Sequence, residues 1–312
     1  MNEKRKEKTY GVVVIATLIS CFVAFFNGYP LVYPDTGSYL HSGWEYVVFL
    51  DRTIFYGLFL HAASYGSYVM GMVFFQGLLV CYLLYKALQL FLSGLRLTIF
   101  YLASVGFVTL FTGFSYNVSI LLPDIFSAIS FLALLVLLLH QHLNWLERVV
   151  LAAIFVFSIC TQLSTLPVLV PVLAAGAVYM LYNTLRKKKT KVGVLKLSIV
   201  AALALSSLLI IPYVHYKTDG NYKISGGSHV FVMNHLIEQS ILDEYLKENC
   251  DKKNYKLCAY KDSIAFLGWD FMWAEKSPLY RTGGWDANRE EYKAIIRDIL
   301  KTPKYRNKAI IK

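Results

Sequence analysis

Charged residues are scarce in the first two thirds of this sequence. Of its 312 residues, 16% are Asp, Glu, Lys or Arg, whereas soluble domains average about 25%. Long stretches between Gly11 and Tyr213 carry almost no charge, and the remainder of the chain carries many. This scarcity excludes an ordinary soluble protein for the first part. We predict an α-helical polytopic membrane domain followed by a small, mainly helical water-soluble domain.

The sequence also lacks any nucleic-acid-binding motif, although its net charge is +11. Its basic residues cluster beside hydrophobic stretches, where they set the orientation of membrane helices. We therefore expect a lipid bilayer, and not nucleic acid, as a partner of this chain. No internal repeat is apparent, although a transporter built from two related halves would have one.

Hydrophobic stretches of suitable length recur along the chain. A helix needs about 20 apolar residues to cross a hydrocarbon core of about 30 Å. The stretch 148–184 is far too long for one crossing, and we place a break at the polar run Thr161–Thr165, before Pro167, because proline disfavours helix at the preceding residue. We predict seven spans, near 11–28, 67–92, 97–114, 120–140, 148–164, 166–184 and 193–213.

Basic residues mark alternate connections between these spans. They precede the first span and follow the second, fourth and sixth, as Lys4, Arg96, Arg148 and the run Arg186–Lys191. The positive-inside rule then places residues 1–10 in the cytoplasm. Seven crossings in the transmembrane domain 11–213 place the loop 29–66 and the domain 214–312 on the outer face. We predict a multi-pass protein of the cytoplasmic membrane.

The chain has only five cysteines, and their positions agree with this topology. Cys21, Cys81 and Cys160 lie in predicted spans, where a thiol acts as a small buried hydrophobe. Cys250 and Cys258 are the two in the C-terminal domain. An oxidising compartment would let them form a disulfide bond, which we predict, with free thiols as the alternative. Zinc is disfavoured because two cysteines without a histidine at ligand spacing cannot fill four positions.

Asp35 follows Pro34 just past the first span. Two interpretations remain open for it. The sequence Pro-Asp-Thr-Gly is typical of a turn or of the start of a short helix. A carboxylate held at the membrane boundary would also be partly desolvated and therefore more basic than usual.

The rest of the loop 29–66 is aromatic and contains Tyr39, Arg52 and His61. It is too interrupted to span the membrane and too apolar to be a free loop. We predict one or two helices that lie in the membrane interface, with a plain aromatic anchor as the alternative. Arg52 could anchor lipid headgroups, or its planar fork could bind a phosphate or pyrophosphate.

Asp124 lies at the predicted outer end of the fourth span, after Pro123. An acid near a membrane is costly unless it faces water or a partner. Pro and Asp are also favoured where helices begin, so capping and a functional role are both open. For Gln162, at the outer end of the fifth span, the default explanation is a polar contact between helices, and a functional role is the alternative. All these residues converge on one predicted face, which makes them candidate site residues.

Three short motifs resemble bacterial glycosyltransferases of the C superfamily (GT-C). These enzymes are polytopic and similar to protein mannosyltransferases and the aminoarabinose lipid A transferase. The resemblance covers roughly residues 10–185, and members usually have more spans and more residues. The motifs are Pro34-Asp35-Thr36-Gly37-Ser38-Tyr39-Leu40, Asp51-Arg52-Thr53-Ile54-Phe55-Tyr56-Gly57 and Phe75-Gln76-Gly77.

The resemblance implies a chemistry for the candidate residues. In that superfamily an acid on the first outer loop is catalytic, which corresponds to Asp35, and a second acid on a later outer loop corresponds to Asp124. The donor is a sugar on a polyprenyl phosphate, whose phosphate Arg52 would meet. We count Tyr39, His61 and Gln162 as further substrate contacts. No Asp-x-Asp motif occurs, so we expect no cofactor, with a divalent metal left open.

We therefore expect an inverting glycosyltransferase that acts on the outer face, with an unknown acceptor. The alternative is a transporter or assembly protein for envelope glycolipids, in which the acids pair with Arg52 structurally. A polymerase or ligase of surface polysaccharide is a third and chemically similar possibility. The rim position of the charges and the lack of a repeat favour surface chemistry over translocation.

Overall fold

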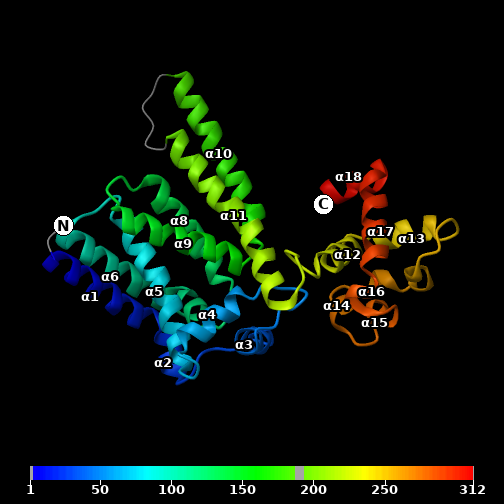
Figure 1. Cartoon of the computed structure of the whole chain (residues 1–312), viewed down its shortest axis with the longest axis horizontal. Coiled ribbons are helices and arrows are strands. Elements are labelled where there is room, and N and C mark those ends of the chain that lie inside the picture. The colour runs from blue at the N-terminus through cyan, green and yellow to red at the C-terminus, as the bar shows by residue number, and fades with distance from the viewer. Residues whose placement is uncertain (1–2, 187–192, 312) are drawn as a thin grey trace. The chain divides into compact units, whose positions relative to one another are not determined.

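The computed structural model describes residues 3–186 and 193–311, so the basic run after Arg186 lies outside the described residues. All regular secondary structure in this part of the chain is helical (Figure 1). The chain divides into two compact units. One comprises Met1–Phe49 and Thr53–Ile224, and the other comprises Leu50–Arg52 and Ser225–Lys312.

The first unit is a bundle of long and short helices. Four of them, α5, α6, α10 and α11, are long and apolar enough to cross a membrane, which suits a lipid bilayer environment. The helices are α1 (Glu3–Ser20), α2 (Phe22–Asn27), α3 (Thr36–Glu45), α4 (Phe55–Ala63), α5 (Val69–Leu88), α6 (Gly94–Phe111), α7 (Phe114–Ser119), α8 (Ile125–Leu139), α9 (Trp145–Thr161), α10 (Thr165–Leu185) and α11 (Val194–Asp219).

Each predicted span corresponds to a helix, or in the first case to the pair α1 and α2. The predicted break is confirmed, since α9 ends at Thr161 and α10 begins at Thr165. Pro167 lies in the first turn of α10. Backbone N–H groups in the first turn have no acceptor within the helix, so the missing N–H of proline costs no hydrogen bond there. Seven crossings stay a prediction, because among the described residues four helices meet the length and hydropathy of a span.

The aromatic loop forms two helices, as predicted, and these pack unusually closely. Gly43 on α3 lies against Gly57 on α4, and a Cβ at Gly57 would lie 2.6 Å from the backbone nitrogen of Gly43. A Cβ at Gly43 would clash with the Gly57 carbonyl. The backbones of α3 and α4 can approach this closely only because neither residue has a side chain.

A core of aromatic and aliphatic side chains joins α4, α5, α8 and α9. Tyr56, Phe126 and Phe155 are fully buried in it. The start of α9 is fixed by a capping box, in which the Asn144 side chain accepts from the N–H of Glu147 and the Glu147 side chain accepts in return. The α3–α4 pair is thus attached to a well-packed bundle.

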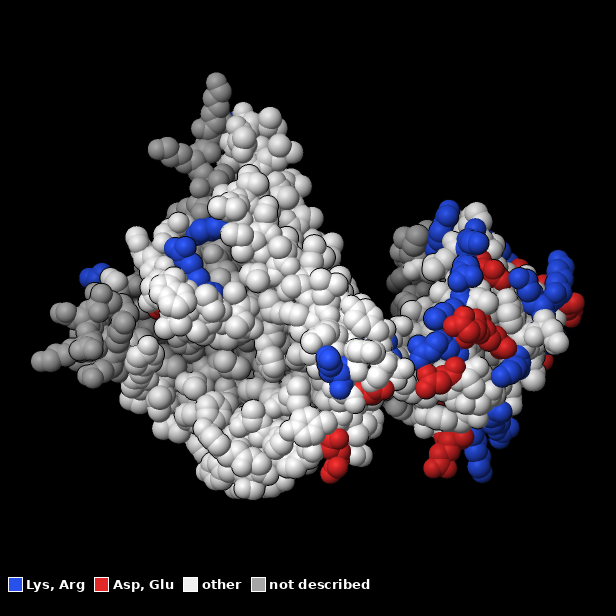
Figure 2. Space-filling model, in the orientation of Figure 1, with Lys and Arg blue, Asp and Glu red and all other residues white. Residues whose placement is uncertain are grey.

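The second unit is built from short helices and carries most of the visible charge (Figure 2). The Cys250 and Cys258 sulfurs lie at disulfide bonding distance, with Cα atoms 5.6 Å apart, which confirms the predicted pair. The thiols of Cys21, Cys81 and Cys160 are free and buried. The helices are α12 (Ser228–Glu238), α13 (Leu242–Asn249), η1 (Lys256–Tyr260), η2 (Ile264–Phe266), α14 (Asp270–Trp273), α15 (Pro278–Arg281), α16 (Gly284–Ala287), α17 (Arg289–Lys301) and α18 (Pro303–Ile311).

Candidate functional site

Asp35 occupies the N-cap position of α3 and is half-buried. The turn before this helix is held by Thr36, whose N–H donates to the Tyr33 carbonyl (2.8 Å) and whose hydroxyl accepts from the Tyr33 N–H (2.9 Å). The Asp35 carboxylate makes no capping bond to α3. Thr36 therefore supplies the side chain that closes this turn.

Asp124 occupies the same position before α8 and likewise makes no capping bond. The predicted N-cap position is thus confirmed, but the capping interaction is not present. Its exposed carboxylate instead accepts a hydrogen bond from the Gln162 side-chain amide (3.1 Å). Gln162 follows the last residue of α9, so this bond joins two predicted site residues and connects the start of α8 to the end of α9.

The loops that carry the two acids are bonded to each other. Leu31 and Ile120 form a parallel β-bridge, and the Leu121 N–H donates to the Leu31 carbonyl (2.9 Å). The Thr36 hydroxyl donates to the Leu121 carbonyl (3.0 Å). Each acid stands the same number of residues after its bridge partner. The structure therefore brings the two loops together in register, although the sequence separates them widely.

The elements before these loops also correspond. An 18-residue helix and a 6-residue helix precede each Pro-Asp loop, as α1 and α2 in one case and α6 and α7 in the other. The short helices contact each other, since the hydroxyls of Ser115 and Ser119 on α7 accept from the N–H groups of Val23 and Ala24 at the start of α2 (both 3.0 Å). The sequence concealed this correspondence because the two segments share few residues.

Tyr39 and Tyr56 lie beside the acids. Their rings meet edge to face with centroids 5.0 Å apart, and the Tyr56 hydroxyl donates to the Gln76 side-chain oxygen (3.3 Å). Burial raises the pKa of Tyr56 well above its ordinary value, and the nearby Tyr39 and Asp124 add to the rise. The Gln76 amide donates to the Ile120 carbonyl (2.9 Å). Tyr56 is therefore a neutral donor that helps to support the second acidic loop.

Arg52 belongs to the second unit and is paired with its neighbour. Its Nε donates to the Asp51 carboxylate at 2.9 Å, and Nη2 bonds the same oxygen. The two side chains are mostly buried, with exposed fractions of 13% for Arg52 and 15% for Asp51. The predicted phosphate-binding fork is thus held by a carboxylate, and its place relative to the two acids of the first unit stays a prediction.

Two glycines of the second unit pack on the segment that carries Arg52. A Cβ at Gly226 would lie 2.7 Å from the Leu50 side chain, and one at Gly227 would lie 3.1 Å from the Leu50 carbonyl. The same Cβ at Gly227 would meet the Trp285 ring at 2.6 Å. Side chains at these positions would displace Leu50, so the second unit contains the glycines that position the segment Leu50–Arg52.

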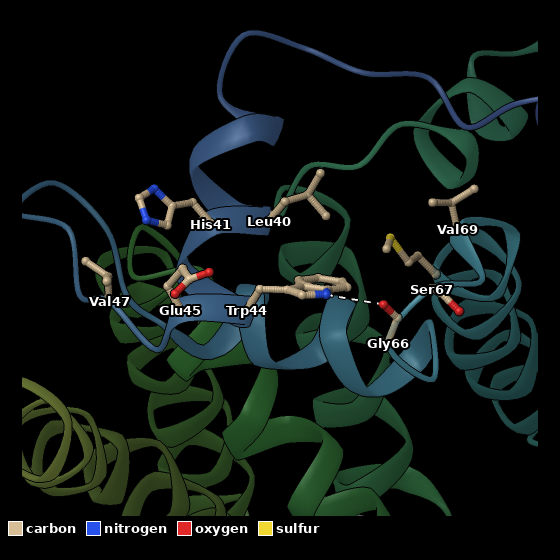
Figure 3. Close-up of a pocket in the computed structure, with 9 residues that line it drawn as sticks. Leu40, His41, Trp44, Glu45, Val47, Gly66, Ser67 and Val69 are labelled. Atoms are coloured by element: carbon tan, nitrogen blue, oxygen red, sulfur yellow. Dashed lines mark hydrogen bonds between the residues drawn. The ribbon is translucent and has the colours of Figure 1, made fainter.

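His61 supports Trp44 in the α3–α4 pair. Its ring stacks on the Trp44 indole with centroids 4.7 Å apart, and its Nδ1–H donates to the Gly43 carbonyl (3.0 Å). The indole N–H donates to the Gly66 carbonyl (3.2 Å), as the dashed line in Figure 3 marks. His61, which the sequence predicted to bind substrate, therefore has a structural role in the α3–α4 pair.

A pocket of about 630 Å³ opens along α3, a size typical of small-molecule sites. Figure 3 shows His41 and Glu45 on one side of the helix and Trp44 directed toward Gly66 on the other. The pocket therefore offers an aromatic face together with an imidazole and a carboxylate.

The metal independence of the site stays a prediction. Within residues 3–186 and 193–311, no group of three or more His, Cys, Asp or Glu side chains gathers as a metal site. The arrangement can supply two carboxylates on adjacent loops, and these can accept protons or bind a cation.

Sequence reasoning missed the supporting role of Gln76 and the contact between Gly43 and Gly57. The available signal for Gln76 was an amide in the middle of an apolar stretch, because a buried amide needs partners. The glycines gave no signal beyond their residue type, because the close approach depends on how α3 and α4 pack. Comparison with protein-family models, with curated proteins and with solved structures found no match for this chain.

Proposed function

We propose that this chain is a membrane glycosyltransferase, similar in architecture to the C superfamily. It would move a sugar from a polyprenyl-phosphate donor to an acceptor on the outer face of the cytoplasmic membrane. The observation that carries the proposal is the pair of Pro-Asp loops bonded in register, with carboxylates that do not cap their helices. Acids whose only role was to cap the start of a helix would make the capping bonds.

The proposal includes the topology. Seven crossings, with the N-terminus inside, place both acidic loops and the C-terminal domain outside. The disulfide bonding distance between Cys250 and Cys258 supports an outer location for the C-terminal domain, since disulfides persist in oxidising compartments.

In the proposed reaction Asp35 is the general base. It takes the proton of the acceptor group as that group bonds to the sugar carbon, and the bond from this carbon to the phosphate oxygen breaks. Arg52 receives the negative charge that develops on the departing polyprenyl phosphate. Asp124, held by Gln162, faces the same reaction space. A single displacement inverts the sugar carbon.

The test is the substitution Asp35→Asn. Asparagine keeps the shape of the side chain but cannot accept the proton, so sugar transfer should fall by about 10²–10⁴. Thr36 holds the turn, so folding and lipid binding should survive. The assay follows transfer from a membrane-lipid extract, alongside binding of a polyprenyl-phosphate analogue. The exposed Asp262→Asn serves as a control, and full transfer by Asp35→Asn would exclude Asp35 as the base.

A transporter or assembly protein for envelope glycolipids is the second candidate. The correspondence of α1–α2 with α6–α7 favours it, because many transporters contain related halves. The related segments here lie side by side and place acids at one end, which suits surface chemistry better. Movement of a labelled lipid across reconstituted vesicles, without any sugar transfer, would favour the transporter.

A further inference from the structure

The second unit exposes an aromatic surface on the segment 264–274. Phe266, Trp269 and Trp273 have exposed fractions of 87%, 63% and 49%. Large aromatic side chains are usually mostly buried, because each can remove 150–250 Å² from water. Three exposed ones within eight residues mark an interaction site. We define these three residues as the aromatic surface.

The aromatic surface stands on a firm base. Ile264, Phe271 and Met272, from the same segment, are buried in the core of the second unit. Successive backbone turns continue through the segment, with Asp270 N–H donating to Leu267 (2.8 Å) and Met272 N–H donating to Trp269 (3.1 Å). One side of the segment is thus fixed in the core, so the exposed rings project from a defined structure and not from a loose loop.

The chemistry of this surface suits the boundary between lipid and water. Asp270 is the one charged residue between Ile264 and Ala274, although the second unit is otherwise rich in charge (Figure 2). Tryptophan concentrates at membrane interfaces, where its ring meets apolar chains and its N–H meets polar groups.

The chain connection keeps the second unit near the end of α11. Residues 220–224 join them, and five residues reach at most about 18 Å when fully extended. This connection is folded back, since His215 Nδ1 bonds the Lys223 carbonyl (2.9 Å) and the Lys223 ammonium pairs with Asp219 (3.3 Å). Because α11 is apolar and long enough to cross a membrane, a connection of this length from its end lets the second unit reach the bilayer surface.

We propose that the aromatic surface inserts into the interfacial layer of the bilayer and so orients the second unit on the membrane. Phe266, the most exposed of the three, enters deepest, and Trp269 and Trp273 lie at the headgroup level. The proposal requires α11 to cross the membrane. It does not depend on the chemistry of the acids in the first unit.

Spin labels on the full chain in lipid nanodiscs test this proposal. Nitroxides are placed at Phe266→Cys and Trp269→Cys, with Glu290→Cys, on an exposed part of α17, as the matched control. Cys21, Cys81 and Cys160 are buried and Cys250 is paired with Cys258, so the introduced thiols are the reactive ones. Labels at 266 and 269 should collide more with oxygen, which concentrates in lipid, than with a water-soluble nickel complex. The label at 290 should show the reverse.

Two results would overturn the proposal. Labels at 266 and 269 that match the one at 290 would place the surface in water. Labels shielded from both reagents would mean that protein covers it. A second measurement guards against disturbance by the labels themselves. In the double variant Phe266→Asp, Trp269→Asp, which carries its one label at position 290, that label should gain motion as the unit lifts from the bilayer, while the disulfide stays intact.

Discussion

Asp35 and Asp124 hold the same position relative to their helices, but their surroundings differ. Asp35 is half-buried, whereas Asp124 is exposed and receives a hydrogen bond from the Gln162 amide. The two acids therefore differ in their exposure to solvent, and the Gln162 amide fixes the position of the Asp124 carboxylate.

At Arg52 we predict an effect on donor binding. Arg52→Lys keeps the charge but loses the planar fork, so it should weaken binding of a polyprenyl-phosphate analogue. Arg52→Ala also removes the charge and should weaken binding by about 10- to 150-fold, the equivalent of one charged hydrogen bond of about 1.5–3 kcal/mol. Equilibrium binding to the purified protein measures both.

Asp51→Asn is the matched control for this prediction. It removes the carboxylate that now engages the guanidinium, and it leaves the positive charge in place. Binding should therefore be retained or become tighter. If Arg52→Ala bound the analogue as well as the unchanged protein, Arg52 would have a structural role and no role in donor binding.

The contact between α3 and α4 should be sensitive to substitution. Gly43→Ala places a methyl group against the Gly57 backbone, and overpacking of this kind typically costs about 1–3 kcal/mol. Thermal unfolding should shift to lower temperature. Gly37→Ala, on the same helix with no heavy atom near its Cβ, should leave stability unchanged or raise it slightly. Equal effects of both substitutions would refute the close contact.

The sequence predicted the helices well and their contacts poorly. Hydrophobic stretches located the long helices, and the polar run at Thr161–Thr165 located the break between α9 and α10. Aromatic composition predicted α3 and α4. The sequence could not reveal that Leu31 pairs with Ile120, because that bridge forms between backbone groups that every residue has.

For the candidate site too, the sequence predicted which residues take part better than it predicted their contacts. The sequence located Asp35, Asp124 and Gln162 at one end of the spans, and the structure joined the last two by a hydrogen bond. The absence of capping bonds could not be foreseen, because Pro-Asp before a helix is typical of caps. The pairing of Arg52 with Asp51 was equally hidden, since adjacent residues of opposite charge often point apart.

The second unit should lose stability in acid. Hydrogen bonds from Lys253, then Tyr255 and Tyr245, hold the pKa of Asp298 below its ordinary value. A carboxylate whose pKa is lower when folded adds stability above its unfolded value, about 3.9, and loses it as the pH falls through the folded value.

Hydrogen exchange of α13 and α17 measures this effect. Protection should be steady from about pH 5 to 7 and should decrease below about pH 4. Asp298→Asn should be less stable at neutral pH and less sensitive to acid. An unchanged acid dependence in that variant would assign the effect to other carboxylates, such as Glu244, whose pKa is lowered by Lys308 and Lys304.

For the whole molecule we predict the orientation in the membrane. The charge pattern places Lys187 in the cytoplasm and Cys258 on the outer face of the membrane. Lys187 is not among the described residues. A membrane-impermeant thiol reagent applied to intact cells after reduction should label a variant whose only cysteine is Cys258. Labelling that appeared only after the membrane was broken would reverse the orientation and would move the acids to the cytoplasmic side.

The packing of Leu50 against Gly226 and Gly227 has a consequence for biosynthesis. The segment Leu50–Arg52 leaves the ribosome long before Ser225, by an interval on the order of 10–30 s at about 5–20 residues per second. By the end of this interval the helices α1–α11 of the first unit have been made, but Gly226 and Gly227 have not. A nascent chain, or one truncated before Ser225, can therefore carry both acidic loops while the segment Leu50–Arg52 still lacks the glycines on which it packs.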